Sequence, residues 1–244
     1  MDTNTKYPIT NICSNRVLVD YRTSEESVQE LIKLGIDVYK STRVESLYEE
    51  VAGHPDMQIH FINKKAICAP EVFQYYKSLD LTDIELVCGS KPLKPTYPDD
   101  VAYNVCNIGK YVILRPLSVT IEILEEYHYL KKEILKSKQG YAKCSICVVN
   151  DKSAITSDEG VYKLLKENNL NVLKITEGYI ELNKMKGFIG GASGLINNDT
   201  LVFNGDLKMN PDYENIISFC KNVGVDAVSL NKGNLVDIGS ILRF

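Results

Sequence analysis

Residues 59–70, "IHFINKKAICAP", contain two short apolar runs separated by polar residues. The first run ends on the pair Ile62-Asn63, and the second begins at Ala66 after two lysines. Short runs rich in β-branched and apolar residues, with a brief polar break between them, are typical of two strands joined as a hairpin. The stretch therefore predicts a β-hairpin, and the same pattern returns along the chain.

The hairpin pattern recurs at a nearly constant interval, which indicates a repeat architecture. A comparable residue pair ends an apolar run five times, and the second residues of these pairs are 46, 41, 47 and 46 positions apart. The pairs are Ile62-Asn63, Ile108-Gly109, Val149-Asn150, Ile196-Asn197 and Leu242-Arg243. A helical stretch and a third short strand usually follow each hairpin, as in residues 71–81 and 84–88. We expect each repeat to be a ββαβ unit.

Residues 119–136, "VTIEILEEYHYLKKEILK", fit this pattern least well. Their apolar residues recur at helical spacing, so they predict one longer helix. No clear third strand then precedes "GYAKCSICVVN" at residues 140–150. We therefore expect this repeat to be irregular.

The last repeat lacks its second strand, because the chain ends with "DIGSILRF" at residues 237–244. The missing strand is found at the other end of the chain, in "NRVLVDYR" at residues 15–22. We expect Val17 to Tyr21 to pair with Ile238 to Phe244, which leaves no unpaired sheet edge. The expected fold is an α/β, five-fold pseudo-symmetric α/β-propeller, forming a single domain over residues 1–244. The alternative is an ordinary α/β sheet whose strands recur by chance.

Composition narrows the possible partners. The net charge is −4 and no run of Lys and Arg is longer than a pair, so the sequence lacks the basic surface that nucleic acid requires. The N-terminus has no signal-peptide pattern, and no apolar run reaches the roughly 18 residues of a membrane span. We expect a cytoplasmic protein without nucleic-acid or membrane partners. The seven cysteines form an odd set in a long chain, which favours reduced thiols.

Five ββαβ units joined head to tail resemble the pentein fold, which is shared by guanidine-modifying enzymes and a non-catalytic ribosome anti-association initiation factor. "GHPDMQIHF" at residues 53–61 resembles the Gly-His-x-Asp segment of these enzymes, and "GNLVDIGS" at 233–240 resembles their Gly-Asn-x-His-Cys segment. Together with residues 97–105, 140–145 and 187–194, these motifs are most similar to a bacterial, largely clostridial, family of unknown function with this fold.

The resemblance implies roles for individual residues. It identifies His54 as a general acid/base and Asp56 as a carboxylate that holds a guanidinium group. Asn234 matches the start of the nucleophile segment. Val236 and Asp237, however, stand where that segment has its histidine and its nucleophilic cysteine. Covalent catalysis at the family's usual position is therefore impossible in this chain.

The repeat itself points to a different nucleophile. Counting back six residues from the second member of each pair gives Met57, Tyr103, Cys144, Gly191 and Asp237. If the first strands face a common axis, these residues converge on one central funnel. We expect the Cys144 thiol to attack a substrate there, with neighbouring Lys143 favouring the thiolate. The alternative is an ordinary structural cysteine on a strand.

His54 and Asp56 are two residues apart, which on a strand places both side chains on one face. A carboxylate beside an imidazole is suited to acid/base chemistry near neutral pH. The alternative is a turn in which Asp56 caps a backbone N–H. A distance of about 4 Å or less between the Cys144 sulfur and a His54 nitrogen, or a position of both within reach of one small ligand, would favour catalysis.

The expected site therefore has three catalytic residues and a polar, glycine-rich surround. The catalytic residues are Cys144, His54 and Asp56, and the substrate-binding residues are Asp237, Asn104, Asp100, Lys143, Gly190, Gly191, Ser193 and Asn234. The glycines are expected to keep one wall of the funnel open to a ligand. Cys144 and Cys147 form a Cys-x-x-Cys motif, but residues three apart on a strand point to opposite faces. We therefore expect no metal and no cofactor.

Two functions fit these expectations. The first is a cysteine-dependent hydrolase or transferase that acts on a small cationic guanidino or amidino compound, which acidic groups at the funnel would bind. The alternative is a non-catalytic pentein, similar to the ribosome anti-association factor, that binds a small molecule or a macromolecular partner.

Overall fold

The structure is a computed structural model, and it describes residues 15–244 apart from residues 80 and 184. In this part of the chain the strands form five three-stranded sheets and one small hairpin. In each three-stranded sheet the first strand pairs antiparallel with the second, which pairs parallel with the third. The sheets are β3 (Ile59–Ile62), β4 (Lys65–Cys68) and β5 (Glu85–Cys88); β6 (Cys106–Ile108), β7 (Tyr111–Leu114) and β8 (Glu133–Lys136); β9 (Cys147–Asn150), β10 (Ser153–Thr156) and β11 (Asn171–Lys174); β14 (Ser193–Leu195), β15 (Thr200–Phe203) and β16 (Asp226–Ser229); β17 (Leu242–Arg243), β1 (Arg16–Val19) and β2 (Asp37–Lys40).

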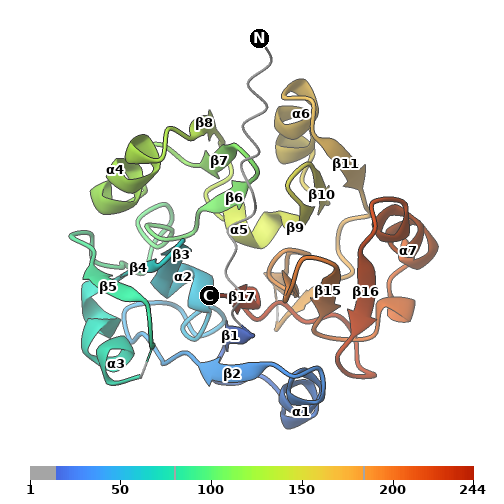
Figure 1. Ribbon diagram of the computed structural model, residues 1–244, viewed down its shortest axis with the longest axis horizontal. Coiled ribbons are helices and arrows are strands. Elements are labelled where there is room, and N and C mark those ends of the chain that lie inside the picture. Colours follow the sequence, from blue (N-terminus) through green and yellow to red (C-terminus); the bar gives the residue numbers. More distant parts are fainter. Residues whose placement is uncertain (1–14, 80, 184) are drawn as a thin grey trace.

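A helix connects the second strand to the third in every sheet, since a parallel pair needs a crossover connection. These helices are α3 (Phe73–Ser78), preceded by η1 (Pro70–Val72), α4 (Ile121–Tyr129), α6 (Glu159–Glu167), α7 (Tyr213–Asn222), preceded by η2 (Leu207–Met209), and α1 (Glu25–Lys33). Figure 1 shows the sheets around a common centre with the helices at the periphery. In α6, the Asp158 side chain caps the helix at Val161, while Val161 and Leu165 bury one face.

The two ends of the described chain share a sheet. β17 pairs antiparallel with β1, with Val17 opposite Arg243 and Leu18 opposite Leu242. The expected pairing of the terminal segments is confirmed, although β17 is shorter than expected. Phe244 follows the strand and is fully buried, with its ring stacked on Phe61 at a centroid distance of 4.8 Å. Figure 1 shows β17 and the C-terminus near the centre of the molecule.

The expectation of one long helix over residues 119–136 is wrong. α4 ends at Tyr129, and Lys131 then takes a left-handed conformation with φ of 53°. The next residues form β8, which pairs parallel with β7. The helical spacing of apolar residues continued by chance into a strand, so this unit has the same ββαβ order as the others.

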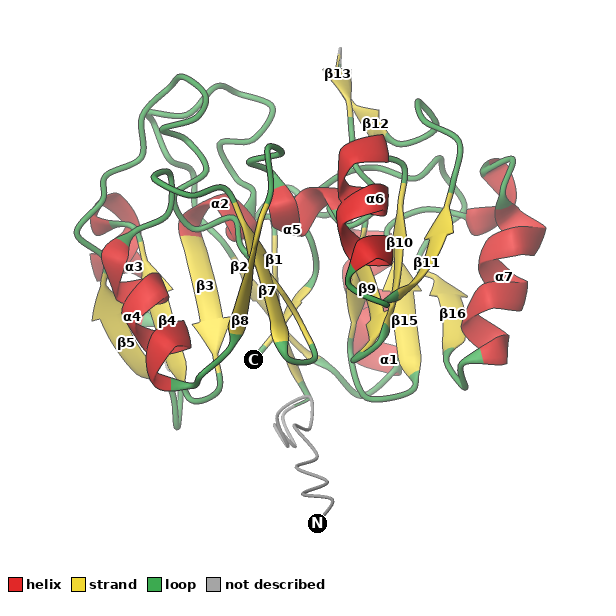
Figure 2. Cartoon of the chain, turned by 90° about the horizontal axis from the view of Figure 1, so that it is seen from above, coloured by secondary structure: helices red, strands yellow, loops and turns green. Residues whose placement is uncertain are grey.

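Two short helical turns precede first strands and carry site residues. α2 (Pro55–Gln58) leads into β3, and α5 (Ala142–Ser145) leads into β9. Asp56 and Cys144 therefore lie on helical turns, and the expectation that they lie on strands is wrong. Asp56 Oδ2 accepts hydrogen bonds from the Cys144 and Ser240 side chains rather than capping a backbone N–H. Pro55 explains the first of these turns, because its fixed φ suits the first helical position. Figures 1 and 2 show α2 and α5 side by side.

A small hairpin and the apolar core complete the fold. β12 (Glu181–Leu182) pairs with β13 (Met185–Lys186), and Glu181 also bridges to Val236. Figure 2 shows this hairpin at the upper edge of the molecule. The largest group of buried apolar side chains extends across several sheets, from Leu18 to Val112 and Phe244. Within the described residues, no helix has both the length and the apolar character needed to cross a membrane.

Candidate active site

Three side chains with complementary chemistry meet where α2 and α5 lie together. His54 immediately precedes α2, Asp56 lies on it, and Cys144 lies on α5. One nitrogen, one carboxylate oxygen and the sulfur all lie within 4.8 Å of one another. This bound is slightly looser than a 4 Å sulfur–nitrogen criterion, but it puts all three groups within reach of one small ligand. The three side chains are at most 3% exposed.

The Cys144 thiol has two polar neighbours. It donates a hydrogen bond to Asp56 Oδ2 at 3.0 Å and accepts one from Asn104 Nδ2 at 3.1 Å. Burial raises the pKa of the thiol well above its usual value, and the charges of Asp56 and Asp237 raise it further. The expectation that Lys143 favours the thiolate is wrong for this arrangement, because Lys143 Nζ donates to Ser240 Oγ at 3.1 Å instead.

His54 and Asp56 present polar atoms that are buried but unpaired. Among the described residues, neither His54 ring nitrogen nor Asp56 Oδ1 has a hydrogen-bond partner. Asp56 Oδ2, in contrast, accepts hydrogen bonds from Cys144 and from Ser240 Oγ at 2.7 Å. Buried polar groups are nearly always satisfied, so an orphaned group calls for an explanation, such as a bound ligand or a catalytic role.

Asp237 forms another wall of the site. Its carboxylate accepts hydrogen bonds from the backbone N–H groups of Phe188 at 2.8 Å and Gly239 at 3.0 Å. His54 Nδ1 lies 3.8 Å from Asp237 Oδ1. Burial raises the pKa of Asp237, the His54 charge lowers it, and the charge of Asp56 raises it. The two carboxylates are therefore close enough to repel each other.

The alignment of the five repeats, counted back six residues from the second residue of each pair, predicts most of this convergence. Asn104 Nδ2 lies 3.1 Å from Cys144 Sγ and 3.5 Å from Met57 Sδ, and a Cβ on Gly191 would lie 2.0 Å from Asp237 Oδ1. The alignment fails for the Tyr103 hydroxyl, which donates to the Lys91 carbonyl away from the site. Four of the five aligned positions thus contact the site or adjoin it, namely Met57, Cys144, Gly191 and Asp237.

The glycines do not hold a wall open. A Cβ on Gly190 would lie 2.5 Å from the carbonyl oxygens of Lys143 and Ile146, and one on Gly191 would overlap the Asp237 carboxylate. Glycine is needed here because protein atoms already fill the space. The prediction of a ligand-facing glycine wall is therefore wrong, and these residues instead allow Asp237 and α5 to pack closely. Ser193 is buried, with its hydroxyl donating to the Ile189 carbonyl.

Asn234 does not belong to the site. Its side chain is exposed, and its Nδ2 donates to Glu181 Oε1 at 2.6 Å. The segment that matches the nucleophile motif enters the interior only from Leu235 onward. Asn234 is therefore not brought together with His54, Asp56 and Cys144, and its role in substrate binding stays a prediction.

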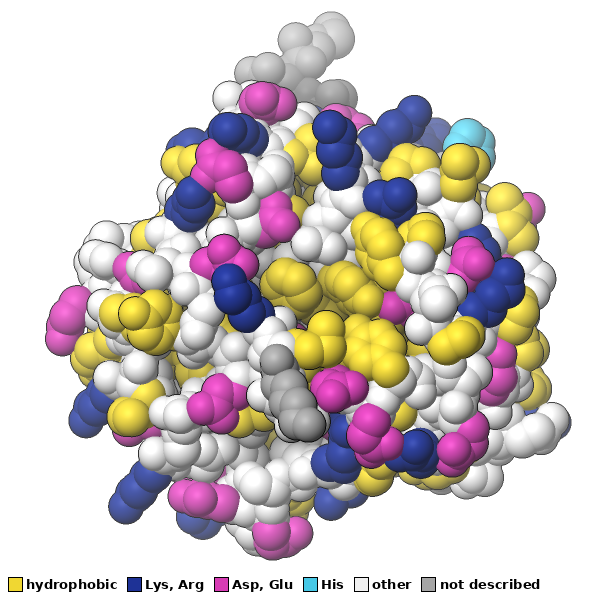
Figure 3. Space-filling model, turned by 180° about the vertical axis from the view of Figure 1, so that it is seen from behind, with side chains coloured by type: hydrophobic (Ala, Val, Ile, Leu, Met, Phe, Trp, Pro, Cys, Tyr) yellow, Lys and Arg dark blue, Asp and Glu magenta, His cyan; other side chains and the backbone are white. Residues whose placement is uncertain are grey.

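An aromatic layer that sequence reasoning missed lies beside the site, around the predicted residue Asp100. Asp100 accepts a hydrogen bond from the Tyr141 hydroxyl at 2.6 Å, and Tyr141 contacts the Tyr48 hydroxyl at 3.2 Å. The Tyr141 ring also packs near Phe188 and stacks with Tyr97. Figure 3 shows apolar side chains gathered near the centre of the face opposite to that in Figure 1. The sequence could have pointed to Tyr141, because it lies three residues before Cys144, whereas nothing in the sequence pointed to Tyr48.

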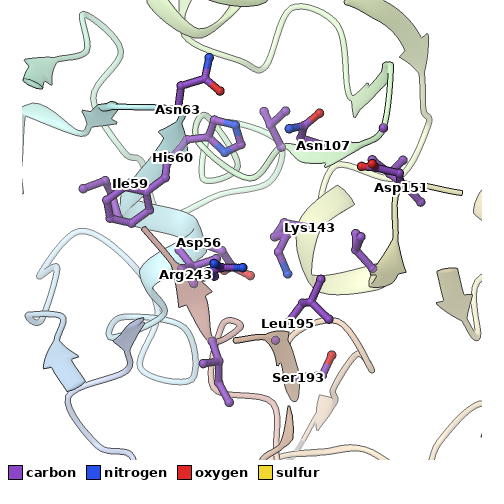
Figure 4. Close-up of a pocket in the computed structure, with 18 of the residues that line it drawn as sticks. Asp56, Ile59, His60, Asn63, Asn107, Lys143, Asp151, Ser193, Leu195 and Arg243 are labelled. Atoms are coloured by element: carbon purple, nitrogen blue, oxygen red, sulfur yellow. The ribbon is translucent and has the colours of Figure 1, made fainter. Parts of the chain in front are cut away.

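A cavity of about 210 Å³ reaches the site from the direction of the first strands. Its lining includes Asp56, Lys143, Ser193, His60, Asn107 and Arg243. Figure 4 shows Asp56 and Lys143 projecting toward each other within it. His60 Nε2 contacts the Tyr127 hydroxyl at 2.6 Å, and burial, with a smaller effect of Lys143, lowers the pKa of His60 to about 3. The imidazole that lines this cavity is therefore neutral near pH 7.

The chain matches a sequence family over most of its length and, over a shorter stretch, curated lysine–tRNA ligases. Residues 18–242 match the family described as "Family of unknown function (DUF6873)". A lysine–tRNA ligase of Ureaplasma parvum is 37% identical over 97 residues, which are 39% of this chain and 17% of that enzyme. The corresponding ligase of Ureaplasma urealyticum is 36% identical over 96 residues, with the same coverage of both chains. The chain thus spans less than a fifth of the length of these relatives.

Several solved structures share the fold. DDAH from Pseudomonas aeruginosa, in complex with citrulline, superimposes with a TM-score of 0.58 at 9% identity, covering 94% of this chain and 98% of that one. Agmatine deiminase from C. Jejuni gives 0.54 at 10% identity, with 90% and 89% covered. The inosamine-phosphate amidinotransferase of Streptomyces griseus gives 0.53 at 12% identity, with 96% and 94% covered. All three are pentein-fold proteins, and identities this low establish the fold alone.

Proposed function

This chain belongs to the DUF6873 family of unknown function, and we propose that its central site is that of a hydrolase or transferase acting on a small guanidino or amidino compound. The observation that carries the proposal is the convergence of the His54 imidazole, the Asp56 carboxylate and the Cys144 thiol within 4.8 Å. These groups are the acid/base, the cation partner and the nucleophile that such a reaction requires. The names of the structural neighbours, among them an agmatine deiminase and an amidinotransferase, support the same substrate class.

Recognition of the substrate rests on the two carboxylates. A guanidinium group is planar and donates paired hydrogen bonds, which a carboxylate accepts in a two-pronged arrangement. Asp56 Oδ1 has no partner among the described residues, and Asp237 lies beside His54 on the neighbouring wall. The cavity next to Asp56 gives the rest of the substrate room. A cation between the carboxylates would relieve their repulsion, which adds to the effect of burial in raising the pKa of Asp237.

The reaction proceeds by nucleophilic substitution at the central carbon of the guanidinium. Cys144 passes its proton to His54 and forms a bond from sulfur to that carbon, producing a tetrahedral intermediate. His54 returns the proton to the departing nitrogen, the C–N bond breaks, and an amine leaves. Water, or a second amine in a transferase, then attacks the thioether carbon after giving a proton to His54. The C–S bond breaks, and the thiolate regains that proton.

Three further side chains would hold this machinery in place. Asn104 links the thiol to the backbone of α5, since its Oδ1 accepts from the Lys143 N–H at 2.7 Å. Ser240 connects Asp56 to Lys143 Nζ and so orients the carboxylate. Asp100, held by Tyr141, would add negative charge at the aromatic side of the site. These residues position the reacting groups without taking part in bond changes.

We also propose that the five sheets form one domain with five-fold pseudo-symmetry, closed by the β17–β1 pair. The sheets share their strand order and their pattern of antiparallel and parallel pairing. In this arrangement the segments that precede the first strands, among them α2 and α5, lie near the axis. Residues from distant repeats can therefore form one site. A single closed domain also explains how Asp237, near the C-terminus, adjoins His54.

A second function is favoured by two observations. Burial and the charges of Asp56 and Asp237 raise the pKa of the Cys144 thiol, which donates a hydrogen bond to Asp56, and Asp237 stands at the usual cysteine position of the guanidine-modifying penteins. Both features suit a pentein that binds a cationic ligand without turning it over. Binding is common to both functions, so the distinguishing property is chemical turnover by Cys144.

Ligand binding and turnover test the proposal together. A thermal-shift screen with guanidino and amidino compounds should identify at least one that raises the melting temperature, because a ligand that binds only the folded state stabilises it. Wild-type protein should convert that compound with release of ammonia or an amine, and Cys144→Ala should not. Binding without release supports the non-catalytic function. The absence of any guanidino or amidino ligand, or equal turnover by Cys144→Ala, contradicts the proposed enzyme.

A further inference from the structure

We propose that His54, Asp56 and Cys144 form a binding site for a divalent transition-metal ion of the Zn²⁺ class. Sulfur, imidazole nitrogen and carboxylate oxygen are the three donor types that Zn²⁺ takes from proteins. Among residues 15–244, with 80 and 184 set aside, these three side chains form a group whose donor atoms all lie within 4.8 Å of one another. Their combination also favours Zn²⁺ or Co²⁺ over Mg²⁺ and Ca²⁺, which prefer oxygen ligands.

The spacing of the donors suits a tetrahedral ion. Metal–ligand distances of about 2.0–2.3 Å place the donors of a tetrahedral zinc site roughly 3.3–3.7 Å apart. The Cys144 sulfur lies 3.0 Å from Asp56 Oδ2, and the remaining distances stay below 4.8 Å. Small side-chain movements would therefore bring all three donors onto one ion.

The unpaired atoms give independent support for a ligand. Both ring nitrogens of His54 and Oδ1 of Asp56 lack hydrogen-bond partners in the described part of the chain, although both side chains are about 99% buried. A desolvated imidazole and carboxylate oxygen that are left unpaired cost folding free energy unless something binds them. A metal ion would satisfy one atom of each residue at once.

The neighbours of the three donors resemble the surroundings of established metal sites. Asp237 Oδ1 lies 3.8 Å from His54 Nδ1, which leaves Nε2 to bind the ion while the carboxylate orients the ring. Cys147, the other member of the Cys-x-x-Cys motif, is not part of the group. The site is therefore assembled from two repeats rather than from the local Cys-x-x-Cys motif.

Binding exchanges one proton for the metal ion. The thiol hydrogen that now points to Asp56 is released to solvent, and the sulfur lone pair forms the bond to the metal. The fourth position of a tetrahedral ion would remain for water or another small ligand. Asp56 lines the neighbouring cavity, from which an ion would reach the site.

The metal and a guanidinium group would use the same carboxylate and thiol. If the proposed function is correct, Zn²⁺ and the guanidino ligand therefore compete, and the metal inhibits turnover. The metal site itself does not depend on that function, since its donors and geometry are independent of any reaction.

Cobalt substitution provides the test. Co²⁺ should be added alone to metal-free Cys88→Ser protein, because Cys88 is an exposed thiol that could bind the ion nonspecifically. We expect a near-ultraviolet thiolate-to-Co²⁺ charge-transfer band that saturates at one equivalent and disappears when Zn²⁺ is added. Cys144→Ser in the same background should abolish the band. His54→Gln should weaken affinity at least 10-fold, and Asp237→Asn should weaken it about 10- to 100-fold.

A second measurement covers the possibility that these variants fold poorly. In the Cys88→Ser protein, one equivalent of Zn²⁺ should protect Cys144 from alkylation after brief exposure to reagent, as read by peptide mass mapping. No charge-transfer band, a band that persists in Cys144→Ser, or unchanged alkylation of Cys144 would each overturn the metal site. Metal binding in a protein that turns over no guanidino compound would overturn the proposed function and leave the metal site intact. Turnover of a guanidino compound without metal binding would overturn the metal site and leave the proposed function intact.

Discussion

At the residue scale, the site combines close packing with unpaired polar atoms. The Asp56 and Asp237 carboxylates share one buried space with His54, and Gly191 leaves room for Asp237 because it has no side chain. The alignment of the repeats identified Cys144 from the sequence, because four of the five residues that lie six positions before the second residue of each pair contact or adjoin the site. It could not identify Ser240 or Tyr48, because their roles depend on contacts between segments that are distant along the chain.

Gly191→Ala should disrupt the site and the fold together. Its Cβ would lie 2.0–2.5 Å from the Asp237 carboxylate, so either the carboxylate or the backbone must move. We expect a loss of about 1–3 kcal/mol in unfolding free energy, the usual cost of overpacking, measured by denaturant titration. Gly160→Ala, in helix α6, serves as the control and should be neutral or stabilising. Equal stability of the two variants would show that Asp237 is not packed against Gly191.

At the scale of elements, local sequence patterns predicted strands better than helix boundaries. The hairpins were correct because alternating polar and apolar residues and turn residues agree, as in β3 and β4. The boundary between α4 and β8 could not be predicted from the sequence, because neither Leu130 nor Lys131 is a glycine or proline that would mark the end of the helix. The short turns α2 and α5 were missed because four residues are too few to show helical periodicity.

The contact between β3 and α4 makes stability depend on pH. His60 is buried against the Tyr127 hydroxyl, and its pKa is lowered to about 3 by burial and by the Lys143 charge. The unfolded chain, with a His pKa near 6.5, binds a proton more readily than the folded chain. The contribution of His60 is therefore complete above pH 6.5 and is lost as the pH falls toward 3.

We expect the His60 effect to reach at most about 1.4 kcal/mol per pH unit between pH 6.5 and 3. Urea titrations across this range should show a steeper loss of unfolding free energy in wild-type protein than in His60→Gln. Parallel pH profiles for the two proteins would indicate that His60 is not held neutral in the folded state.

At the scale of the whole molecule, the joining of the two chain ends was the most informative prediction from sequence. The last repeat lacked a second strand, and the first strand of the chain had no partner. The two segments were therefore expected to pair, and β17 does pair with β1. The sequence could not show which contacts keep the C-terminal segment in place. Phe244 does so through its ring contacts with Phe61 and with Tyr39, whose ring centroid lies 5.3 Å away.

Removal of residues 242–244 should destabilise the whole domain. It deletes β17 and the buried Phe244 ring but leaves Asp237 and Ser240 in the chain. Truncation of a buried Phe alone costs about 3–5 kcal/mol, so the melting temperature should fall markedly in one cooperative transition. Phe244→Leu, which keeps the strand, should have an intermediate effect. A truncated protein with an unchanged melting temperature would contradict closure by the terminal strands.

The central claim is that Cys144 reacts within a site that selects cations, and charge-dependent alkylation tests it most directly. The protein is treated separately with a haloacetamidine, which is cationic, and with the neutral haloacetamide of similar size, and peptide mass mapping gives the labelling rates of Cys144 and of the exposed Cys88. The carboxylates of Asp56 and Asp237 should attract the amidinium, so the ratio of Cys144 to Cys88 labelling should be at least 10-fold higher with the cationic reagent. Asp237→Asn should remove most of that preference. Equal ratios for the two reagents, or labelling of Cys88 without any labelling of Cys144, would contradict the account.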